Sequence, residues 1–313
     1  MRNFLFLSGP TASGKTRLAI ELAKKFGAVI FNCDSIQVYH ELNIGAAKPS
    51  PQERSEVPHF LFDVMSAPDV MTAGKYRKFF LNELENIPET QLIIVVGGTG
   101  FYYRALEKGL FDISETPVEI KEALNEELKS NGGKTDLFWQ EILNRDPEYA
   151  GKIHPNDEYR ILRAIEILRQ NPDTNVTLLN QGKINDSEST TIGRILKLHL
   201  QLEPSLLNQR IEQRVKQMFD NGMIEEVESL LGKGLKTWSP LSSVGYFEVC
   251  QYLLGHENRL GLEERILIST RQLAKKQRTW FKKEPDLIAL DATEPGSLKT
   301  KAEAHLASFL SNM

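Results

Sequence analysis

A phosphate-binding loop near the N-terminus constrains the fold of this chain more than any other feature. Residues 9–16 read GPTASGKT, which has the spacing G-x-x-x-x-G-K-T. The apolar stretch Phe4–Ser8 comes directly before the loop and is a predicted strand. Apolar side chains recur every four residues over Arg17–Phe26, which predicts a helix with one buried stripe. A strand, this loop and a helix together predict a P-loop NTPase-like α/β fold.

The same loop predicts how a phosphate chain is held. Its glycines let backbone N–H groups turn towards an anion, and the positive end of the helix dipole adds to the attraction. Lys15 supplies a charge to the terminal phosphate, and the Thr16 hydroxyl is the predicted Mg²⁺ ligand. The predicted phosphate-binding residues are Gly9, Pro10, Thr11, Ala12, Ser13, Gly14, Lys15 and Thr16.

The loop does not specify the reaction. NTPases and kinases of this fold usually place an Asp at the end of an apolar strand to hold Mg²⁺. Here the most apolar strand, within Gln91–Gly100, ends in the turn GGTG and carries no carboxylate. This absence disfavours γ-phosphoryl transfer, although a P-loop small-molecule or nucleoside kinase stays open as an alternative.

The rest of the chain predicts a parallel sheet flanked by helices, interrupted by a helical insertion. Short β runs alternate with helical patterns in the first hundred residues, as in a parallel α/β sheet. Residues 111–190 carry charged helical patterns and no convincing strand, so we expect an insertion domain there and a core domain over 1–110 and 191–313. Further strands are predicted over Ala28–Cys33, Phe60–Val64 and Ile195–Pro204.

The composition argues against a nucleic-acid coat protein and against a membrane protein. The 313 residues carry a formal net charge of −4, which argues against a generic coat for nucleic acid but allows a local basic face. No apolar run approaches the ~20 residues that span a bilayer, so no membrane partner is expected. Cys33 and Cys250 are the only cysteines, which favours two reduced thiols in a cytoplasmic protein.

An acidic residue follows the second predicted strand. Asp34 lies where the carboxyl ends of parallel strands collect ligands. An Asp at such a place serves as often to cap a turn or a helix. Its position alone therefore leaves a functional and a structural role equally open.

Eight sequence segments, in this order, resemble one enzyme family. They are GPTASGKT, CDSIQVY, IGAAKP, PHFLFDV, VVGGTGFYYRAL, HPNDEYRILRAIE, VGYFE and TRQLAKKQRTWF. Together they resemble the tRNA dimethylallyltransferase (isopentenyl-tRNA transferase) family across nearly the whole chain. Longer members add a C-terminal zinc finger, and this chain lacks the additional cysteines for one, so it resembles the compact bacterial type.

The resemblance implies a substrate pair and a mechanism. The loop would hold the diphosphate of dimethylallyl diphosphate, and the dimethylallyl group would pass to N6 of the adenosine 3′-adjacent to the tRNA anticodon, releasing pyrophosphate. Asp34 would act as general base, Thr99 would touch the reacting nucleotide, and Arg214 would join Lys15 and Thr16 around the diphosphate and its Mg²⁺. No γ-phosphate is consumed in this reaction, in keeping with the missing Walker-type Asp.

A basic segment near the C-terminus suggests an RNA partner. Residues 271–283, RQLAKKQRTWFKK, hold six basic side chains and no acid, with aromatic residues between them. A charge run is usually a solvated face, but the resemblance implies that this one meets the anticodon stem-loop, together with a second basic patch after HPND. The implied tRNA-binding residues are Asp34, Ser35, Ile36, Gln37, Thr99, Tyr159, Arg160, Ile161, Leu162, Arg163, Ser243, Gly245, Tyr246, Lys275, Lys276, Gln277, Arg278, Trp280 and Lys282.

Three hypotheses therefore stand at the level of the sequence. The leading one is a monomeric tRNA prenyltransferase that uses Mg²⁺. The second is a kinase, which would bind ATP tightly and transfer its γ-phosphate. The third is a non-catalytic P-loop protein that binds tRNA in a salt-dependent manner without turnover.

Overall fold

The computed structural model describes residues 1–109, 116–173, 175–177, 192–256 and 258–312. The chain divides into two compact units. The larger unit comprises Met1–Glu107 and Thr191–Met313, and the smaller comprises Lys108–Thr190. These bounds lie close to those expected from the change in sequence character.

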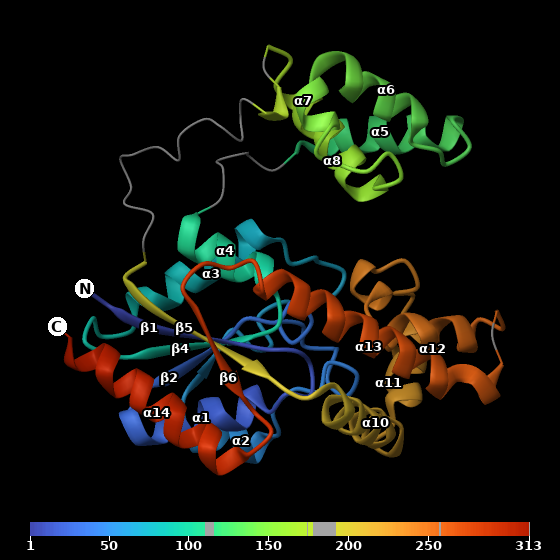
Figure 1. Cartoon of the computed structure of the whole chain (residues 1–313). Coiled ribbons are helices and arrows are strands. Elements are labelled where there is room, and N and C mark those ends of the chain that lie inside the picture. Colours follow the sequence, from blue (N-terminus) through green and yellow to red (C-terminus); the bar gives the residue numbers. More distant parts are fainter. Residues whose placement is uncertain (110–115, 174, 178–191, 257, 313) are drawn as a thin grey trace. The chain divides into compact units, whose positions relative to one another are not determined.

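A six-stranded sheet forms the centre of the larger unit. Its strand order is β3-β2-β4-β1-β5-β6, and every neighbouring pair is parallel (Figure 1). The strands are β1 (Asn3–Ser8), β2 (Val29–Asn32), β3 (His59–Phe60), β4 (Ile93–Gly97), β5 (Arg194–Gln201) and β6 (Leu287–Asp291). The predicted parallel α/β architecture is confirmed.

Helices cover both faces of this sheet. In Figure 1, α1 (Lys15–Phe26), α2 (Pro51–Glu56) and α14 (Pro295–Ser311) lie on one face, and α3 (Ala73–Glu85) and α4 (Gly100–Lys108) on the other. Further helices gather near the carboxyl ends of the strands: α10 (Pro204–Asp220), α11 (Met223–Gly232), α12 (Tyr246–Leu253) and α13 (Leu262–Phe281). None of the described helices has the length and apolar character needed to cross a membrane.

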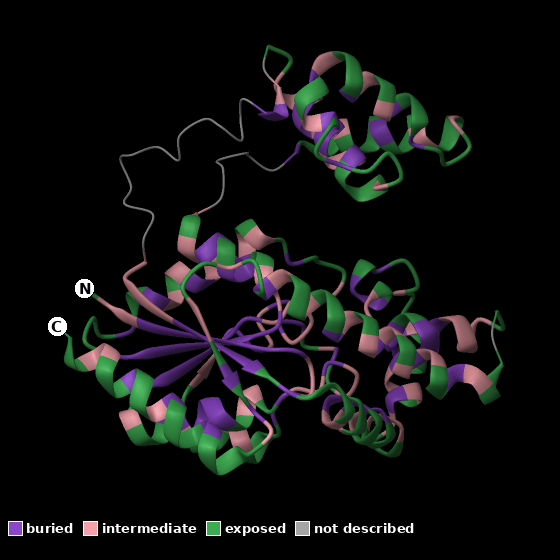
Figure 2. Ribbon diagram, in the orientation of Figure 1, coloured by how far each residue is buried: buried purple, intermediate pink, exposed green. Residues whose placement is uncertain are grey.

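The inner strands of the sheet are largely buried because helices pack on both sides of them (Figure 2). All five residues of β4 are buried, as expected for a continuous apolar run in a parallel sheet. Phe31 packs against Phe80 of α3 with ring centroids 4.9 Å apart. The Tyr103 hydroxyl of α4 lies 2.9 Å from the Leu7 carbonyl oxygen and 3.0 Å from that of Val95. These contacts hold the central strands in fixed positions below the loops that follow them.

The strand expected over Phe60–Val64 is wrong in its extent. The strand β3 ends at Phe60, because Leu61 (φ 63°) and Asp63 (φ 54°) adopt left-handed backbone conformations that no strand accommodates. The edge strand β6 and the helix α14 had no counterpart among the predicted elements.

The smaller unit is helical throughout its described residues, as predicted. Its helices are α5 (Val118–Ser130), α6 (Asp136–Arg145), α7 (Pro147–Ala150) and α8 (Glu158–Gln170). They bury a core of their own, which includes Leu124, Phe138, Ile142, Ile161 and Leu168. Residues 174 and 178–190, which follow α8 in this unit, lie outside the described part of the chain.

Candidate active site

The phosphate loop joins β1 to α1, as its sequence predicts. Gly14 precedes the helix in a left-handed conformation (φ 90°) that favours glycine. A Cβ atom on Gly9 would lie 2.9 Å from the Ser13 hydroxyl oxygen and 3.0 Å from the Leu200 Cβ atom, so a side chain there would distort the loop. The Ser13 hydroxyl is buried and has no hydrogen-bond partner in the described part of the chain, which suits a loop built around an anion.

A cavity of about 140 Å³ opens beside this loop at the carboxyl end of the sheet. Residues far apart in the sequence meet there, and many are those that the sequence singled out. The predicted site residues that line it are Thr11, Lys15, Thr16, Asp34, Ile36, Gln37, Arg214, Ser243, Gly245, Tyr246 and Gln277. The structure thus brings the phosphate loop, the acidic segment and the arginine of α10 into one site.

Two cations and one carboxylate interact across this cavity. Burial, reinforced by the charge of Arg214, lowers the pKa of Lys15 to about 7, while Asp34 acts in the opposite direction. Burial also lowers the pKa of Arg214, again against the effect of Asp34. A bound anion between Lys15 and Arg214 would relieve their mutual repulsion, so the site is suited to a polyanion.

Hydrogen bonds to its neighbours fix Asp34. Its Oδ1 accepts from the Ile36 N–H at 3.0 Å, and its own N–H donates to the Asn32 side chain at 3.1 Å. The Asn32 amide is held in turn by the Leu61 carbonyl oxygen at 3.0 Å. The Asp34 carboxylate keeps lone pairs for a further donor, as a general base requires.

The turn after β4 supports the Asp34 segment from behind. The Thr99 Oγ1 accepts from the Ser35 N–H at 3.0 Å, and the Thr99 N–H donates to the Cys33 carbonyl oxygen at 3.2 Å. A Cβ atom on Gly97 would lie 2.0 Å from that same carbonyl oxygen, so only glycine fits. Thr99 is not among the lining residues, and its contact with the reacting nucleotide stays a prediction.

Two predicted RNA contacts have their polar groups engaged within the protein. The Gln277 Oε1 accepts from the Thr11 N–H at 2.8 Å, and its Nε2 donates to the Gly98 carbonyl oxygen at 3.3 Å. Tyr246 is fully buried, and its hydroxyl donates to Glu226 at 2.6 Å. Both side chains hold loops of the site together, and both also line the cavity, so their contact with tRNA stays a prediction.

Comparisons with known proteins agree with this geometry. A family model described as IPP transferase matches residues 37–284. The chain belongs to the IPP transferase family. It is 44% identical over 290 residues to the tRNA dimethylallyltransferase of Bdellovibrio bacteriovorus, covering 93% of each chain, and 41% identical over 283 residues to that of Koribacter versatilis, covering 90% of each.

Solved structures of IPP transferases share the whole fold. The full-length tRNA isopentenylpyrophosphate transferase of Bacillus halodurans aligns with a TM-score of 0.73 and 26% identity, over 100% of this chain and 98% of that one. A eukaryotic dimethylallyltransferase described as acting on tRNA aligns with a TM-score of 0.78 and 26% identity, over 100% of this chain and 80% of that one. The resemblance carried by the sequence motifs is thereby confirmed.

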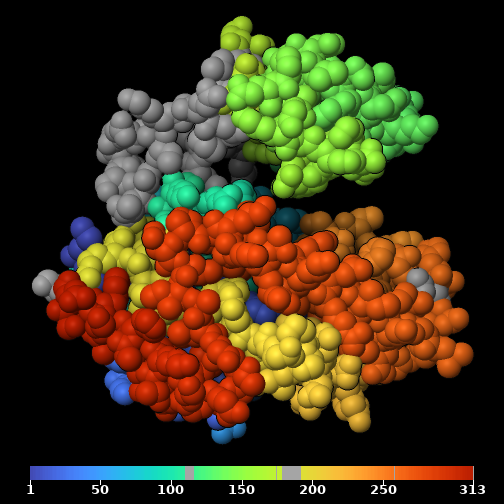
Figure 3. All heavy atoms as spheres, viewed as in Figure 1, coloured from blue at the N-terminus to red at the C-terminus, as the bar shows by residue number. Residues whose placement is uncertain are grey.

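The helix α13 lies at the surface on the face that Figure 3 shows. Its basic side chains are mostly exposed. A groove there is lined by Lys275, Lys276 and Trp280 together with Arg104 and Lys283. Lys282 and Arg278 are also exposed. Arg271 of the same helix is paired with Glu212 at 2.6 Å, so its charge is partly neutralised.

The structure corrects one member of the basic patch expected on the helical unit, and the RNA contacts of the other members stay predictions. Ile161 is completely buried in the core of that unit, so its side chain offers no surface to RNA. Arg163 is paired with Glu166 at 2.5 Å, and Arg160 with Asp157 at 3.4 Å. Tyr159 is 80% exposed and Leu162 is half-buried. The surface of α8 is therefore a mixed one in which acids accompany the arginines.

Three residues near the site escaped the sequence reasoning. Arg210 lies one turn before Arg214 on α10, and its Nη1 is 3.4 Å from the Ser13 carbonyl oxygen of the phosphate loop. Arg104 places its guanidinium 4.6 Å from the centroid of the Trp280 ring. Glu226 bonds to a loop of the cavity wall. Only Arg210 had a signal in the sequence, which is its four-residue spacing from Arg214.

The residues present fit a Mg²⁺ ion that arrives with a diphosphate. The described residues contain no group of three or more His, Cys, Asp or Glu side chains able to hold a metal alone. Mg²⁺ commonly takes only one or two protein ligands and completes its shell with phosphate oxygens and water. The Thr16 hydroxyl lines the cavity and can supply such a ligand.

Proposed function

We propose that this chain transfers the dimethylallyl group of dimethylallyl diphosphate to N6 of the adenosine 3′-adjacent to the anticodon of tRNA and releases pyrophosphate. The observation that carries the proposal is one cavity holding the phosphate loop, Arg214 and the Asp34 carboxylate in a member of the IPP transferase family. The named relatives favour this reaction over the kinase alternative.

In this reaction the bond from the allyl carbon to the diphosphate oxygen breaks, and its electron pair leaves with the diphosphate. Lys15, Arg214 and the loop N–H groups lie where that negative charge develops. Such preorganised stabilisation is usually the largest catalytic contribution in a site of this kind. A Mg²⁺ ion bound through Thr16 and the phosphates would neutralise further charge on the leaving group.

The acceptor side of the reaction needs a base. The adenine N6 lone pair is delocalised into the ring, so the amine is a weak nucleophile. As the N6–carbon bond forms, the Asp34 carboxylate accepts the proton that N6 loses, a contribution of ~10²–10⁴ in rate. The base must leave its stack to reach the cavity, as in other enzymes that modify a nucleobase.

Apolar side chains complete the cavity and suit a five-carbon group. They are Ile36, Phe62, Met218, Val244 and Leu273. Burial of the prenyl carbons against them would contribute ~0.8 kcal/mol per CH₂ group. The polar and apolar parts of the cavity therefore match the two ends of dimethylallyl diphosphate.

The test is mass spectrometry of an unmodified anticodon stem-loop with adenosines 3′ of the anticodon, incubated with dimethylallyl diphosphate and Mg²⁺. The expected product is N6-dimethylallyladenosine, with one pyrophosphate released for each modified base. A parallel incubation with ATP should give no phosphorylated product. A stem-loop that gains no prenyl group would contradict the proposal.

We further propose that the chain acts as a monomer in the cytoplasm, where its tRNA substrate is found. Light scattering coupled to size exclusion should give a mass near 35.5 kDa. A mass of twice that value at assay concentrations would contradict the monomer.

A further inference from the structure

Glu226 of α11 makes an unusually complete set of hydrogen bonds to a loop of the active site. Its Oε2 accepts from the Asn43 N–H at 3.0 Å and the Ile44 N–H at 2.8 Å. Its Oε1 accepts from the Gly45 N–H at 3.2 Å and from the Tyr246 hydroxyl at 2.6 Å. One carboxylate therefore satisfies three successive backbone donors and one side-chain donor.

The segment that Glu226 holds forms part of the cavity wall. Gly45, Ala46 and Ala47 line the cavity. The Ala46 N–H donates to the Tyr246 hydroxyl at 3.1 Å, and a Cβ atom on Gly45 would lie 2.6 Å from the Tyr246 ring. The loop can approach the Tyr246 ring this closely only because residue 45 is a glycine. The negative charge of Glu226 strengthens each hydrogen bond that its carboxylate accepts.

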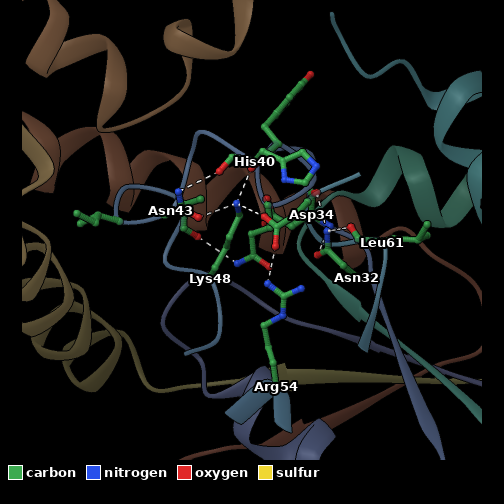
Figure 4. A network of polar contacts seen from close by, with 12 residues as sticks. Asn32, Asp34, His40, Asn43, Lys48, Arg54 and Leu61 are labelled. Atoms are coloured by element: carbon green, nitrogen blue, oxygen red, sulfur yellow. Dashed lines mark hydrogen bonds and ion pairs between the residues drawn. The ribbon is translucent and has the colours of Figure 1, made fainter. Parts of the chain in front are cut away.

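A second group of contacts fixes the other side of the same loop (Figure 4). The buried Lys48 Nζ donates to the Asn43 Oδ1 at 3.0 Å and to the Asp63 Oδ1 at 2.5 Å. Arg54 pairs with the remaining Asp63 oxygen at 2.5 Å. Residues 43–48 are therefore clamped from two directions.

This clamped loop orients Gln37, a residue of the segment that begins at Asp34. The Gln37 Nε2 donates to the Ala46 carbonyl oxygen at 3.1 Å and to the Ala47 carbonyl oxygen at 3.2 Å. Because these carbonyls bind the amino end of the amide, the Oε1 end is left to accept a hydrogen bond. An exocyclic amine such as adenine N6 is a donor of the matching kind.

We propose that Glu226 is a positioning residue for the acceptor base, which acts by holding residues 43–47 so that their carbonyls orient Gln37. The inference rests on the proposed function, since it assigns the amine acceptor to this wall of the cavity. Glu226 has no role in binding the diphosphate, because the diphosphate binds at the phosphate loop.

The test is a double-mutant cycle between Glu226→Gln and Gln37→Ala. Glu226→Gln replaces one acceptor oxygen by an amino group that faces N–H donors, so the loop loses its bonds without a change in side-chain size. We expect kcat/KM for the anticodon stem-loop to fall about tenfold or more, while the Kd of Mg²⁺-pyrophosphate changes by less than twofold. The effects of the two substitutions should not multiply, because both act through the same amide.

Two further variants keep the test informative. Glu228→Gln removes the same charge from an exposed position of the same helix and should change nothing. Tyr246→Phe keeps the ring beside Gly45 but removes the hydroxyl that bridges Glu226 and Ala46, and should give a smaller loss of the same kind. It replaces Glu226→Gln in the cycle if that variant does not fold.

Hydrogen exchange separates this inference from the proposed function. Amide protons of residues 43–46 should exchange faster in Glu226→Gln whether or not the protein prenylates RNA. Unchanged exchange there, fully multiplicative effects in the cycle, or an equal loss of stem-loop and pyrophosphate binding would each overturn the inference. A wild-type protein without prenylation would overturn the proposed function alone.

Discussion

Asp34 shares the cavity with two half-buried cations, Lys15 and Arg214, and hydrogen bonds fix its backbone and one of its oxygens. We predict that Asp34→Asn lowers kcat with the stem-loop by ~10²–10⁴, because the amide cannot take the N6 proton. The Asn side chain still offers an oxygen to the Ile36 N–H, so the melting temperature should change little. Full activity in a folded Asp34→Asn protein would contradict the general-base role.

His199 makes the stability of the protein depend on pH. It is buried beside Ser8, with 2.9 Å between its Nδ1 and the Ser8 hydroxyl, and burial together with the charges of Lys15 and Arg278 lowers its pKa to about 4. The unfolded chain has a histidine pKa of about 6.5, so it binds more protons than the native state between these values. The contribution of His199 to the free energy of unfolding is therefore fully present above pH 6.5 and is lost as the pH falls towards 4.

For this histidine we predict a loss of about 2 kcal/mol of unfolding free energy between pH 7.5 and pH 5. Denaturant titrations of the wild type and of His199→Asn at both pH values measure it. The variant should lose less stability on acidification than the wild type by that amount. Identical losses in the two proteins would show that His199 titrates normally.

At the scale of elements, the last residue of β4, Gly97, packs against the backbone of Cys33, which directly follows β2, without space for a side chain. The Cβ of a Gly97→Ala variant would lie 2.0 Å from the backbone oxygen of Cys33. This oxygen cannot shift without a displacement of the backbone. We predict a destabilisation of about 1–3 kcal/mol and a loss of activity, because the displaced residue precedes Asp34. Thermal unfolding and the prenylation assay measure both effects.

Gly232→Ala is the matched control for that substitution. Gly232 ends α11, and an added Cβ would meet nothing within 4 Å. This variant should be neutral or more stable by about 0.4–1 kcal/mol. If both alanine variants were equally stable, the close packing of the turn would be of no consequence.

The outer face of α13 should carry part of the electrostatic attraction to RNA. We predict that Lys275→Glu weakens binding of the stem-loop and makes the slope of log K against log [salt] shallower by about 1. The affinity for Mg²⁺-pyrophosphate should stay the same, because Lys275 lines the outer groove and not the cavity. The control variant Lys301→Glu reverses the same charge on α14. An equal loss of stem-loop affinity in that variant would show that the effect comes from net charge and not from the position of Lys275.

The sequence predicted those elements whose own residues determine their burial. β1 and β4 are apolar runs enclosed on both faces, and α1 has a clear buried stripe. In β6 only Leu290 is buried, because this strand lies at the edge of the sheet, so its sequence carries no such signal. The early end of β3 depends on the left-handed backbone of Leu61, which no composition rule indicates.

Some residues of the candidate site could also be predicted from the sequence, and others could not. Lys15 and Asp34 belong to local motifs whose spacing carries the chemistry. Glu226 and Gln277 act through partners about 180 and 266 residues away, so their roles exist only once the chain is folded. Ile161 lies within a basic segment by sequence but on the buried side of α8 by helical periodicity.

At the scale of the whole molecule, two separate cores imply two cooperative units. We predict that Ile161→Ala costs about 2–5 kcal/mol and accelerates hydrogen exchange in the helices of residues 116–173 only. The mirror variant Ile94→Ala, in the fully buried β4, should accelerate exchange in the sheet instead. Exchange that increased across both units in either variant would show a single cooperative unit.

The position of Gln277 links two ligands thermodynamically. The helix α13, which contains Gln277, also carries the exposed lysines of the outer groove. The Gln277 amide accepts a hydrogen bond from the Thr11 N–H of the phosphate loop and donates one to the Gly98 carbonyl oxygen. Any displacement of α13 by RNA therefore changes the free energy of the loop that holds the diphosphate. Reciprocity then requires that the prenyl donor alter the affinity for tRNA by the same factor by which tRNA alters the affinity for the donor.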